Sequence, residues 1–229
     1  GMPIYCDIDF PELPSIELPG GYIPEPAPPV TAVPIGSLGC TLDSCFSKCQ
    51  NKSAIGYLRC RRDCVEAKAK FETWYANNTN LGWTVGLPAC PCSVATWVDV
   101  FKVSSCGVTL YESHTVSWEA MDSKTWGSLG PPSGGYHVGA AACMRSVPKN
   151  GHANQCCYDS AGKLLTHGPG SGSADLIPGT PRTFPGHRKN DMLPADWAKA
   201  LDGGGWGCWS EAYLKVRPQV GSDKCAQNP

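Results

Sequence analysis

Apolar side chains, cysteines among them, recur at helical spacing within residues 40–78, a stretch of helix formers that contains no proline. Cys45 and Cys49 are four positions apart, as are Cys60 and Cys64, so each pair shares one face of a predicted helix. The residues between the two pairs include asparagine, serine and glycine, which favour a turn. The pattern predicts two antiparallel helices, and that geometry predicts the nested disulfides Cys45–Cys64 and Cys49–Cys60.

The second of these helices is predicted to continue through Val65 and to end near residues 77–80, where asparagines follow the helix formers. Phe71, Trp74 and Tyr75 lie in its last two turns. We expect these aromatic side chains to face the next part of the chain.

Shorter elements are predicted after Leu81, where glycines and prolines become frequent. A short helix is expected after Cys92 with Ser93 as its N-cap, and short strands and loops are expected over residues 103–140. A last helix is expected over residues 191–205, with a proline in its first turn and a glycine at its end.

Eight prolines lie between Pro11 and Pro34. Such a stretch can neither continue a helix nor lie inside a sheet, so an extended, polyproline-like arm is expected. The arm serves as a spacer or packs along the surface; the alternative is a ligand for a proline-binding module. The pattern divides the chain into an arm (1–39), a helical hairpin (40–80) and a C-terminal domain (81–229).

The cysteine content indicates an oxidising compartment. The chain has 229 residues with 14 cysteines, an even number that is far above the usage of a reduced cytosolic enzyme. We therefore expect a secreted or cell-surface protein. Only 17% of the residues are charged and the net charge is −1, so a nucleic-acid partner is not expected. No apolar run approaches the roughly 18 residues of a membrane span, and no cofactor is expected.

Five groups of residues after Leu81 form an ordered set. They are LPACPCS (87–93), GAAACMRS (139–146), NQCCYDSAGKLLTHGPGSGSADLIP (154–178), His187 with Asp191 and Pro194, and VRP (216–218) followed by Cys225. In order and spacing this set resembles the AMOP domain, the adhesion-associated module of membrane mucins, isthmin and related surface proteins. The resemblance covers about residues 81–228, and the CCYD segment with the glycine-serine run to Asp175 is its most specific part.

The resemblance implies an irregular domain of short strands, short helices and loops, with eight cysteines. That number matches Cys90, Cys92, Cys106, Cys143, Cys156, Cys157, Cys208 and Cys225. Six cysteines then remain; the hairpin uses four, and Cys6 with Cys40 would close the proline-rich arm. The expected fold class is small disulfide-rich α+β, with a disulfide-linked antiparallel helical hairpin followed by an AMOP-like domain.

The twin C-x3-C spacing of the hairpin resembles plant alpha-hairpinins and small mitochondrial import chaperones. Some hairpinins inhibit proteases through a basic loop residue, and Arg59, Arg61 and Arg62 lie near the predicted turn. A protease inhibitor is therefore one alternative function.

The adjacent Cys156 and Cys157 are expected to point apart and to join two different parts of the domain. Tyr158 is expected to bury its ring against the sulfurs, followed by a tight turn at 159–162 and a short strand at 163–166. Zinc binding is a weaker alternative, because C-x-C and CC are poor matches to zinc spacings. A cysteine nucleophile would need a free thiolate, for which the even cysteine count leaves no spare residue.

Asp175, His187 and Asp191 are the candidate polar site. They match polar positions of the AMOP pattern and would either cap and bond loop backbone, or bind a cation or support hydrolysis. Four tryptophans are candidate partner-binding aromatics: Trp118, Trp126, Trp206 and Trp209. His114, His137 and His152 are expected to be ordinary surface residues.

The function expected is an extracellular adhesion or recognition module that binds a protein or glycan partner without turnover. The main alternative is an extracellular hydrolase or cation-binding domain that uses the Asp175–His187–Asp191 cluster. Clustering of these three residues in a pocket would favour the alternative, whereas dispersal of the three with exposed tryptophans elsewhere would favour recognition.

Overall fold

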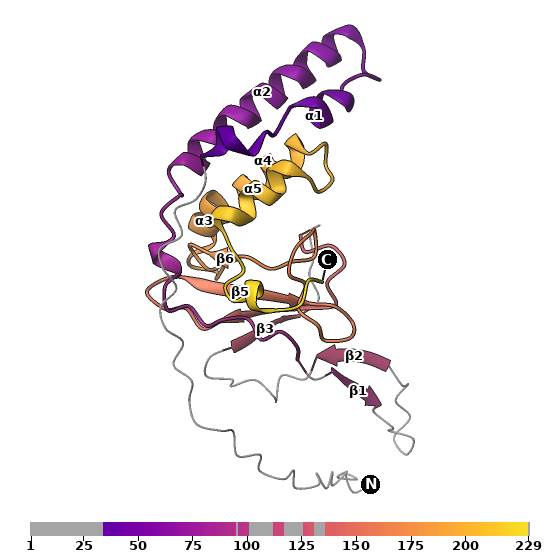
Figure 1. Ribbon diagram of the computed structural model, residues 1–229. Coiled ribbons are helices and arrows are strands. Elements are labelled where there is room, and N and C mark those ends of the chain that lie inside the picture. The colour runs from indigo at the N-terminus through magenta and orange to yellow at the C-terminus, as the bar shows by residue number, and fades with distance from the viewer. Residues whose placement is uncertain (1–33, 95, 101–111, 117–125, 131–135, 229) are drawn as a thin grey trace, which may run out of the picture.

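The computed structural model describes residues 34–94, 96–100, 112–116, 126–130 and 136–228, and between 96 and 130 it describes the backbone alone. The described elements form stacked layers, with a helical hairpin over a second helical layer and a sheet beneath it (Figure 1). The fold is therefore small, disulfide-rich α+β, as the sequence predicts. The predicted arm at 1–33 lies outside the described residues.

The hairpin consists of α1 (Asp43–Ser47) and the much longer α2 (Ala54–Ala76). The Ser53 side chain caps α2 by accepting a hydrogen bond from the Gly56 N–H at 3.3 Å. The helix ends at Ala76 with Asn77 as its C-cap, close to the expected end.

Both predicted hairpin disulfides are confirmed. Cys45 is bonded to Cys64 and Cys49 to Cys60, and three of these four cysteines are buried in a small core of their own. The spacing of four residues within each pair is what allows both bonds to form between two antiparallel helices.

The C-terminal half supplies the second helical layer. Its helical elements are α3 (Phe184–His187), the π-helical turn η3 (Arg188–Met192), α4 (Leu193–Leu201) and α5 (Cys208–Val216). Short 3-10 turns are η1 (Ile35–Leu38), η2 (Gly82–Thr84) and η4 (Ser222–Lys224). The predicted last helix corresponds to α4, and α5 was not expected from the sequence.

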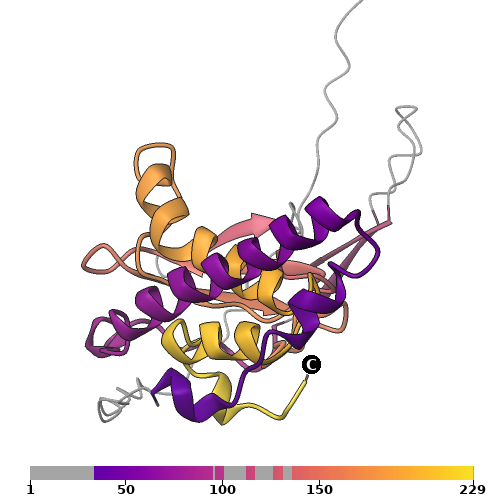
Figure 2. The same ribbon diagram turned by 90° about the horizontal axis from the view of Figure 1, so that it is seen from above.

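The largest core joins α2 to α4 and α5, over which α2 extends in Figure 2. Phe71 and Tyr75 are buried in it, as predicted, and Trp209 packs edge-on against Phe71. The prediction that Trp209 is a partner-binding aromatic is wrong, because its ring is buried and its Nε1 donates to the Thr41 carbonyl at 2.9 Å.

Cys40 is bonded to Cys208, at the start of α5. The predicted Cys6–Cys40 pair is therefore wrong, and so is the assignment of Cys208 to a self-contained set of eight cysteines. Helix α5 packs against the hairpin, which brings these two cysteines together across the boundary that the sequence suggested.

The antiparallel sheet has the order β3-β4-β5-β6, and a separate pair of strands lies beside it (Figure 1). Its strands are β3 (Trp126–Gly130), β4 (Ala142–Ser146), β5 (Ala153–Tyr158) and β6 (Ala174–Asp175), and the pair is β1 (Thr96–Val100) with β2 (Glu112–Val116). The helix predicted after Cys92 is replaced by a bridge from Ser93 to Lys163 and then by β1. The strand predicted at 163–166 is reduced to isolated bridges.

Three more disulfides tie the sheet together: Cys90–Cys156, Cys92–Cys225 and Cys143–Cys157. The adjacent cysteines of β5 thus point to opposite faces, as expected from strand geometry.

Tyr158 is buried beside Cys156, and its hydroxyl donates to the Pro91 carbonyl at 3.0 Å, as expected. The structure has six disulfides among the described cysteines, which indicates an oxidising compartment. Cys6 and Cys106 lie outside the described residues. None of the described helices has the length and apolar character needed to cross a membrane.

Candidate functional site

One face of the sheet is turned toward the helices and forms the floor of a pocket. Cys143 pairs with Cys157 across β4 and β5, and Arg145 pairs with Gln155. Because side chains alternate along a strand, these residues share one face, and Asp175 joins them from β6. The other face carries Cys156 and Tyr158 into a separate core.

The pocket has a volume of about 850 Å³ and lies between this sheet face and helices α3, α4 and α5. Its apolar lining includes Met192, Ala195 and Leu214, with Phe184 and Trp206 as aromatic members. Its polar lining includes both aspartates and the histidine of the predicted site. The three predicted residues therefore meet at one wall of a pocket, with ligand atoms within 4.8 Å of one another.

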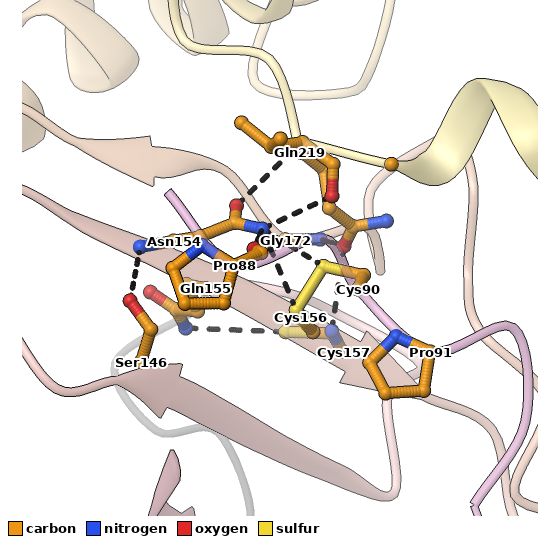
Figure 3. The surroundings of a disulfide bond; sticks show 12 residues. Pro88, Cys90, Pro91, Ser146, Asn154, Gln155, Cys156, Cys157, Gly172 and Gln219 are labelled. Atoms are coloured by element: carbon orange, nitrogen blue, oxygen red, sulfur yellow. Dashed lines mark hydrogen bonds between the residues drawn. A yellow bond between two sulfur atoms is a disulfide. The ribbon is translucent and has the colours of Figure 1, made fainter. Parts of the chain in front are cut away.

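Two buried amide side chains hold the sheet against the C-terminal segment (Figure 3). Asn154 donates to the Pro88 carbonyl at 2.9 Å and to the Val220 carbonyl at 3.0 Å, and it accepts from the Val220 N–H at 3.1 Å. Gln219 accepts from the Gly172 N–H at 2.6 Å and donates to the Leu165 carbonyl at 3.0 Å. These bonds fix the pocket floor to the segment that follows α5.

Gly172, within the glycine-serine run, has to be a glycine because backbone passes directly against it. A Cβ atom there would lie 2.1 Å from the Gln155 carbonyl oxygen and 2.5 Å from Gln219 Oε1. The glycine-serine run therefore passes close to β5. This path places Asp175 at the edge of the pocket floor.

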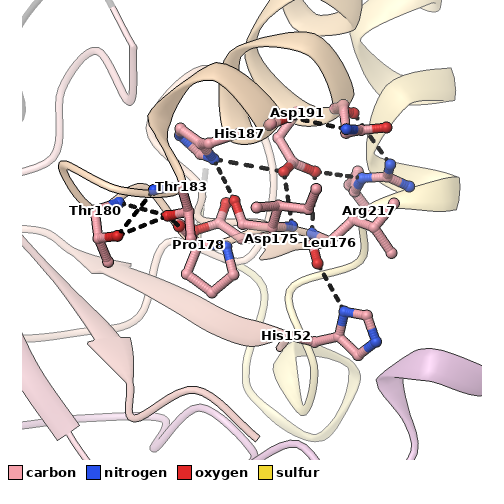
Figure 4. A network of polar contacts seen from close by, with 12 residues as sticks. His152, Asp175, Leu176, Pro178, Thr180, Thr183, His187, Asp191 and Arg217 are labelled. Carbon is pink, nitrogen blue, oxygen red and sulfur yellow. Dashed lines mark hydrogen bonds and ion pairs between the residues drawn. The ribbon is translucent and has the colours of Figure 1, made fainter. Parts of the chain in front are cut away.

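Asp191 organises the loop after β6, and hydrogen bonds converge on its carboxylate in Figure 4. Oδ1 accepts from the Leu176 N–H at 3.0 Å, and Oδ2 accepts from the Ile177 N–H at 3.0 Å. Arg217 Nε donates to Oδ1 at 2.8 Å. Each carboxylate oxygen thus has a backbone partner, which matches the predicted role in bonding loop backbone.

Arg217, from the VRP motif, is fully buried with a relative exposure of 0%. Its Nη2 donates to Asn78 Oδ1 at 2.9 Å and to the Asn190 carbonyl at 3.1 Å, and its guanidinium lies over the Trp74 ring. A buried arginine with this many partners neutralises Asp191 and joins α2, η3 and the segment after α5.

Asp175 is only 3% exposed, yet its Oδ2 has no hydrogen-bond partner, a condition unique among the buried side-chain atoms of the described residues. The closest cation is Arg145, whose Nη1 lies 3.9 Å from that oxygen. Burial, with the nearby Asp191 charge, raises the pKa of Asp175 to about 7 against the opposing effects of His187, Arg145 and Arg217.

His187 links the two aspartates to the pocket wall. Its Nδ1 lies 2.8 Å from the Ile177 carbonyl and 3.4 Å from Asp191 Oδ2. Burial alone would lower its pKa, but the Asp191 bond, the charges of Asp175 and Asp191, and the Ile177 carbonyl together raise it.

His137 is a pocket residue that the sequence did not reveal. It is half-buried rather than a surface residue, with Nδ1 2.6 Å from the Ser171 carbonyl and Nε2 3.0 Å from Gln155 Nε2. Burial lowers its pKa despite the Ser171 bond, so the ring is neutral, with Nδ1–H donating and Nε2 accepting. His152 is also half-buried, and its Nδ1 lies 2.7 Å from the Leu176 carbonyl. His114 lies in β2, where the structure describes only the backbone.

Of the two candidate aromatics whose side chains the structure describes, Trp206 lines the pocket and Trp209 does not. Trp206 is half-buried, and its Nε1 donates to Glu211 Oε1 at 2.5 Å. Trp118 lies outside the described residues, and Trp126 lies in β3, where only the backbone is described. Phe184, which no sequence pattern singles out, is 47% exposed and lines the same pocket.

The arrangement is poorly suited to a resident cation. Arg217 and two backbone N–H groups already occupy the Asp191 oxygens, and Arg145 lies beside Asp175, so positive charge from the protein fills the positions a metal ion would take. The cysteines that lie near other potential ligands are bonded in disulfides and cannot bind zinc.

A hydroxyl nucleophile paired with a histidine base is also missing from the described part of the pocket. The hydroxyl of Ser171 donates to the Gly168 carbonyl at 2.8 Å, and that of Ser210 to Asp202 at 2.6 Å. Neither is bonded to His137 or His187, so the serine–histidine arrangement of covalent hydrolases is not formed among these residues.

The three arginines considered for protease inhibition lie within helix α2, one turn or more beyond its start. Arg61 donates to the Tyr57 hydroxyl at 2.7 Å and lies over the Phe46 ring. They are therefore helical residues, and the exposed basic loop that the inhibitor hypothesis requires is not formed by them.

No protein-family model matches the chain, and no solved structure matches it.

Proposed function

We propose that the chain is a recognition module of a secreted or cell-surface protein and that it binds a protein or glycan partner without turnover. The observation that carries the proposal is the pocket of about 850 Å³ between the sheet and helices α3–α5. Sites for small groups are concave, mostly apolar and about 300–1,000 Å³ in volume, with a few placed polar groups. The pocket has these properties.

The framework around the pocket supports binding because it is fixed before a partner arrives. The Cys143–Cys157 bond crosses its floor, and the Cys40–Cys208 bond anchors α5 in its wall. A pre-formed site loses less conformational entropy on binding than a mobile one.

The AMOP resemblance is consistent with this role, since it implies an adhesive function. Secretion or surface display is likewise part of the proposal, and it is supported by the disulfides. The partner is held through a protruding group that enters the pocket.

The test fills the pocket and compares two matched variants of α4. Ala195 lines the pocket, whereas Ala200 is exposed on the same helix and lies outside it. The intact chain, Ala195→Trp and Ala200→Trp are applied to a glycan microarray and to immobilised collagen, laminin and fibronectin. We expect at least one probe to bind the intact chain and Ala200→Trp but not Ala195→Trp. Binding that survives Ala195→Trp, or no binding to any probe, contradicts the proposal.

An acid–base hydrolase is the second candidate. The clustering of Asp175, His187 and Asp191 in a pocket is the arrangement expected to favour it. However, the Asp191 oxygens are already bonded to Arg217 and to loop backbone, which leaves only Asp175 and His187 for proton transfer. A carboxyl group with a pKa of about 7 is suited to proton transfer near neutral pH. Because the described hydroxyls of the pocket have no histidine base, Asp175 would have to activate water directly. Turnover of nitrophenyl esters or glycosides that is lost in Asp175→Asn would establish this candidate, and its absence leaves recognition.

A further inference from the structure

The polar end of the pocket contains a donor and an acceptor that do not satisfy each other. Arg145 Nη1 and Asp175 Oδ2 are 3.9 Å apart, which is beyond hydrogen-bond range, and Oδ2 is buried without a partner. A hydroxyl group both donates and accepts hydrogen bonds. One hydroxyl, or two on neighbouring carbons, can therefore donate to Asp175 while accepting from Arg145.

The charges around this point favour a neutral ligand. Arg217 balances Asp191, and Arg145 lies opposite Asp175, so with Asp175 ionised these two pairs carry no net charge, and His187 is the further titratable group of the cluster. A cationic ligand at Asp175 would meet two arginines and His187, whereas an anionic ligand at Arg145 would meet an aspartate. Either charge would be desolvated beside a like charge, which is costly in a buried site.

The apolar side of the pocket is suited to a ring. Trp206, held by its bond to Glu211, and the exposed Phe184 both line it. Aromatic rings offer a large, rigid contact area at low entropic cost. Because the aromatic residues and the polar end line the same pocket, a ring with hydroxyls at its edge and C–H groups on its faces offers a matching surface to each.

We propose that the group held in the pocket is a neutral, hydroxylated sugar ring of a glycan, with its hydroxyls on Asp175 and Arg145 and its apolar face against Trp206. This inference rests on the proposed function, which it narrows from a protein or glycan partner to a neutral glycan.

The experiment uses the full chain on a glycan microarray that displays neutral, sialylated, sulfated and amino sugars. The methyl glycoside of the strongest ligand is then titrated while the indole N–H signal of Trp206 is followed by NMR, with Trp206→Phe to assign that signal. We expect a neutral sugar to bind and to shift this signal. Retention of charged glycans alone, or of no glycan, overturns the inference.

Three variants test the contacts. Asp175→Asn keeps the side-chain shape but removes the charged acceptor, so affinity should fall about 10- to 100-fold. Trp206→Ala should lower affinity about three- to tenfold. Leu58→Ala, on the exposed face of α2, is the control and should change nothing. Equal affinity of Asp175→Asn and the intact chain overturns the assignment of Asp175 as the contact.

The failure of this inference can be told from the failure of the proposed function. If Ala195→Trp abolishes binding to an immobilised protein while no glycan binds, the pocket is a recognition site and the sugar assignment is wrong. If Ala195→Trp leaves all binding unchanged, the proposed function itself is wrong.

Discussion

The surroundings of Asp191 and of Asp175 lie on the same pocket wall but differ in how completely their polar atoms are bonded. The Asp191 carboxylate has two backbone N–H groups and the buried Arg217 as partners. The Asp175 carboxylate has a buried oxygen without a hydrogen bond, and its nearest arginine, Arg145, is 3.9 Å away. The first region holds the fold together, and the second contains the unbonded oxygen on which the proposed sugar contact rests.

Removing the charge partner of Asp191 should have the largest effect on the free energy of unfolding. Arg217→Met keeps much of the side-chain volume but leaves Asp191 buried without its charge partner. We expect the free energy of unfolding to fall by about 3–5 kcal/mol, measured by urea denaturation.

The matched control is Arg145→Met in the other region. The side chain of this arginine makes no hydrogen bond among the described residues, and Asp175 can bind a proton when the charge is removed. A change of less than about 1 kcal/mol is expected. Equal losses in the two variants would show that the two regions do not differ.

Asp175→Asn should stabilise the protein above neutral pH. The folded-state pKa is raised from 3.8 to about 7, so the folded chain retains a proton that the unfolded chain has lost. The stability of the intact chain should therefore decline from pH 4 to pH 7 and then level off. The variant lacks this decline and should be about 2–4 kcal/mol more stable at pH 8, with little difference at pH 4. Melting curves across pH provide the measurement, and a variant that is destabilised at pH 8 would contradict the account.

His187→Gln should have a smaller effect with the opposite sign. A raised histidine pKa contributes stability below its unfolded value, which is lost as the pH rises through the folded value. The variant should be less stable than the intact chain by about 1 kcal/mol at pH 5, with a smaller difference at pH 9. A difference that does not change with pH would remove His187 from the charged network.

Local spacing was enough to predict the hairpin. Its two disulfides join residues only 11 and 19 positions apart, and helical periodicity determines which faces meet. The end of α2 near Asn77 and the burial of Phe71 followed from the same pattern.

Such local patterns do not predict packing between segments that are far apart in the sequence. Cys40 and Cys208 are 168 positions apart, and their pairing depends on α5. This helix was not predicted, because it begins in a segment rich in glycine and tryptophan. The burial of Trp209 follows from that same helix.

The candidate site was predicted in part. Asp175, His187 and Asp191 were identified as a possible cluster, and the structure places them together. Their different roles depend on Arg145 and Arg217, whose positions are set by strand register and by the turn after α5, which the sequence pattern did not specify. The AMOP assignment stays a prediction from the sequence motifs.

The most direct test of the difference between the two regions is a carbon-13 NMR titration of the Asp175 carboxyl group, assigned by its loss in Asp175→Asn. The account predicts a midpoint near pH 7 for this group. A midpoint near the ordinary value of 3.8 would mean that the oxygen has a partner in solution, and it would contradict the claim that Asp175 is kept free for a ligand.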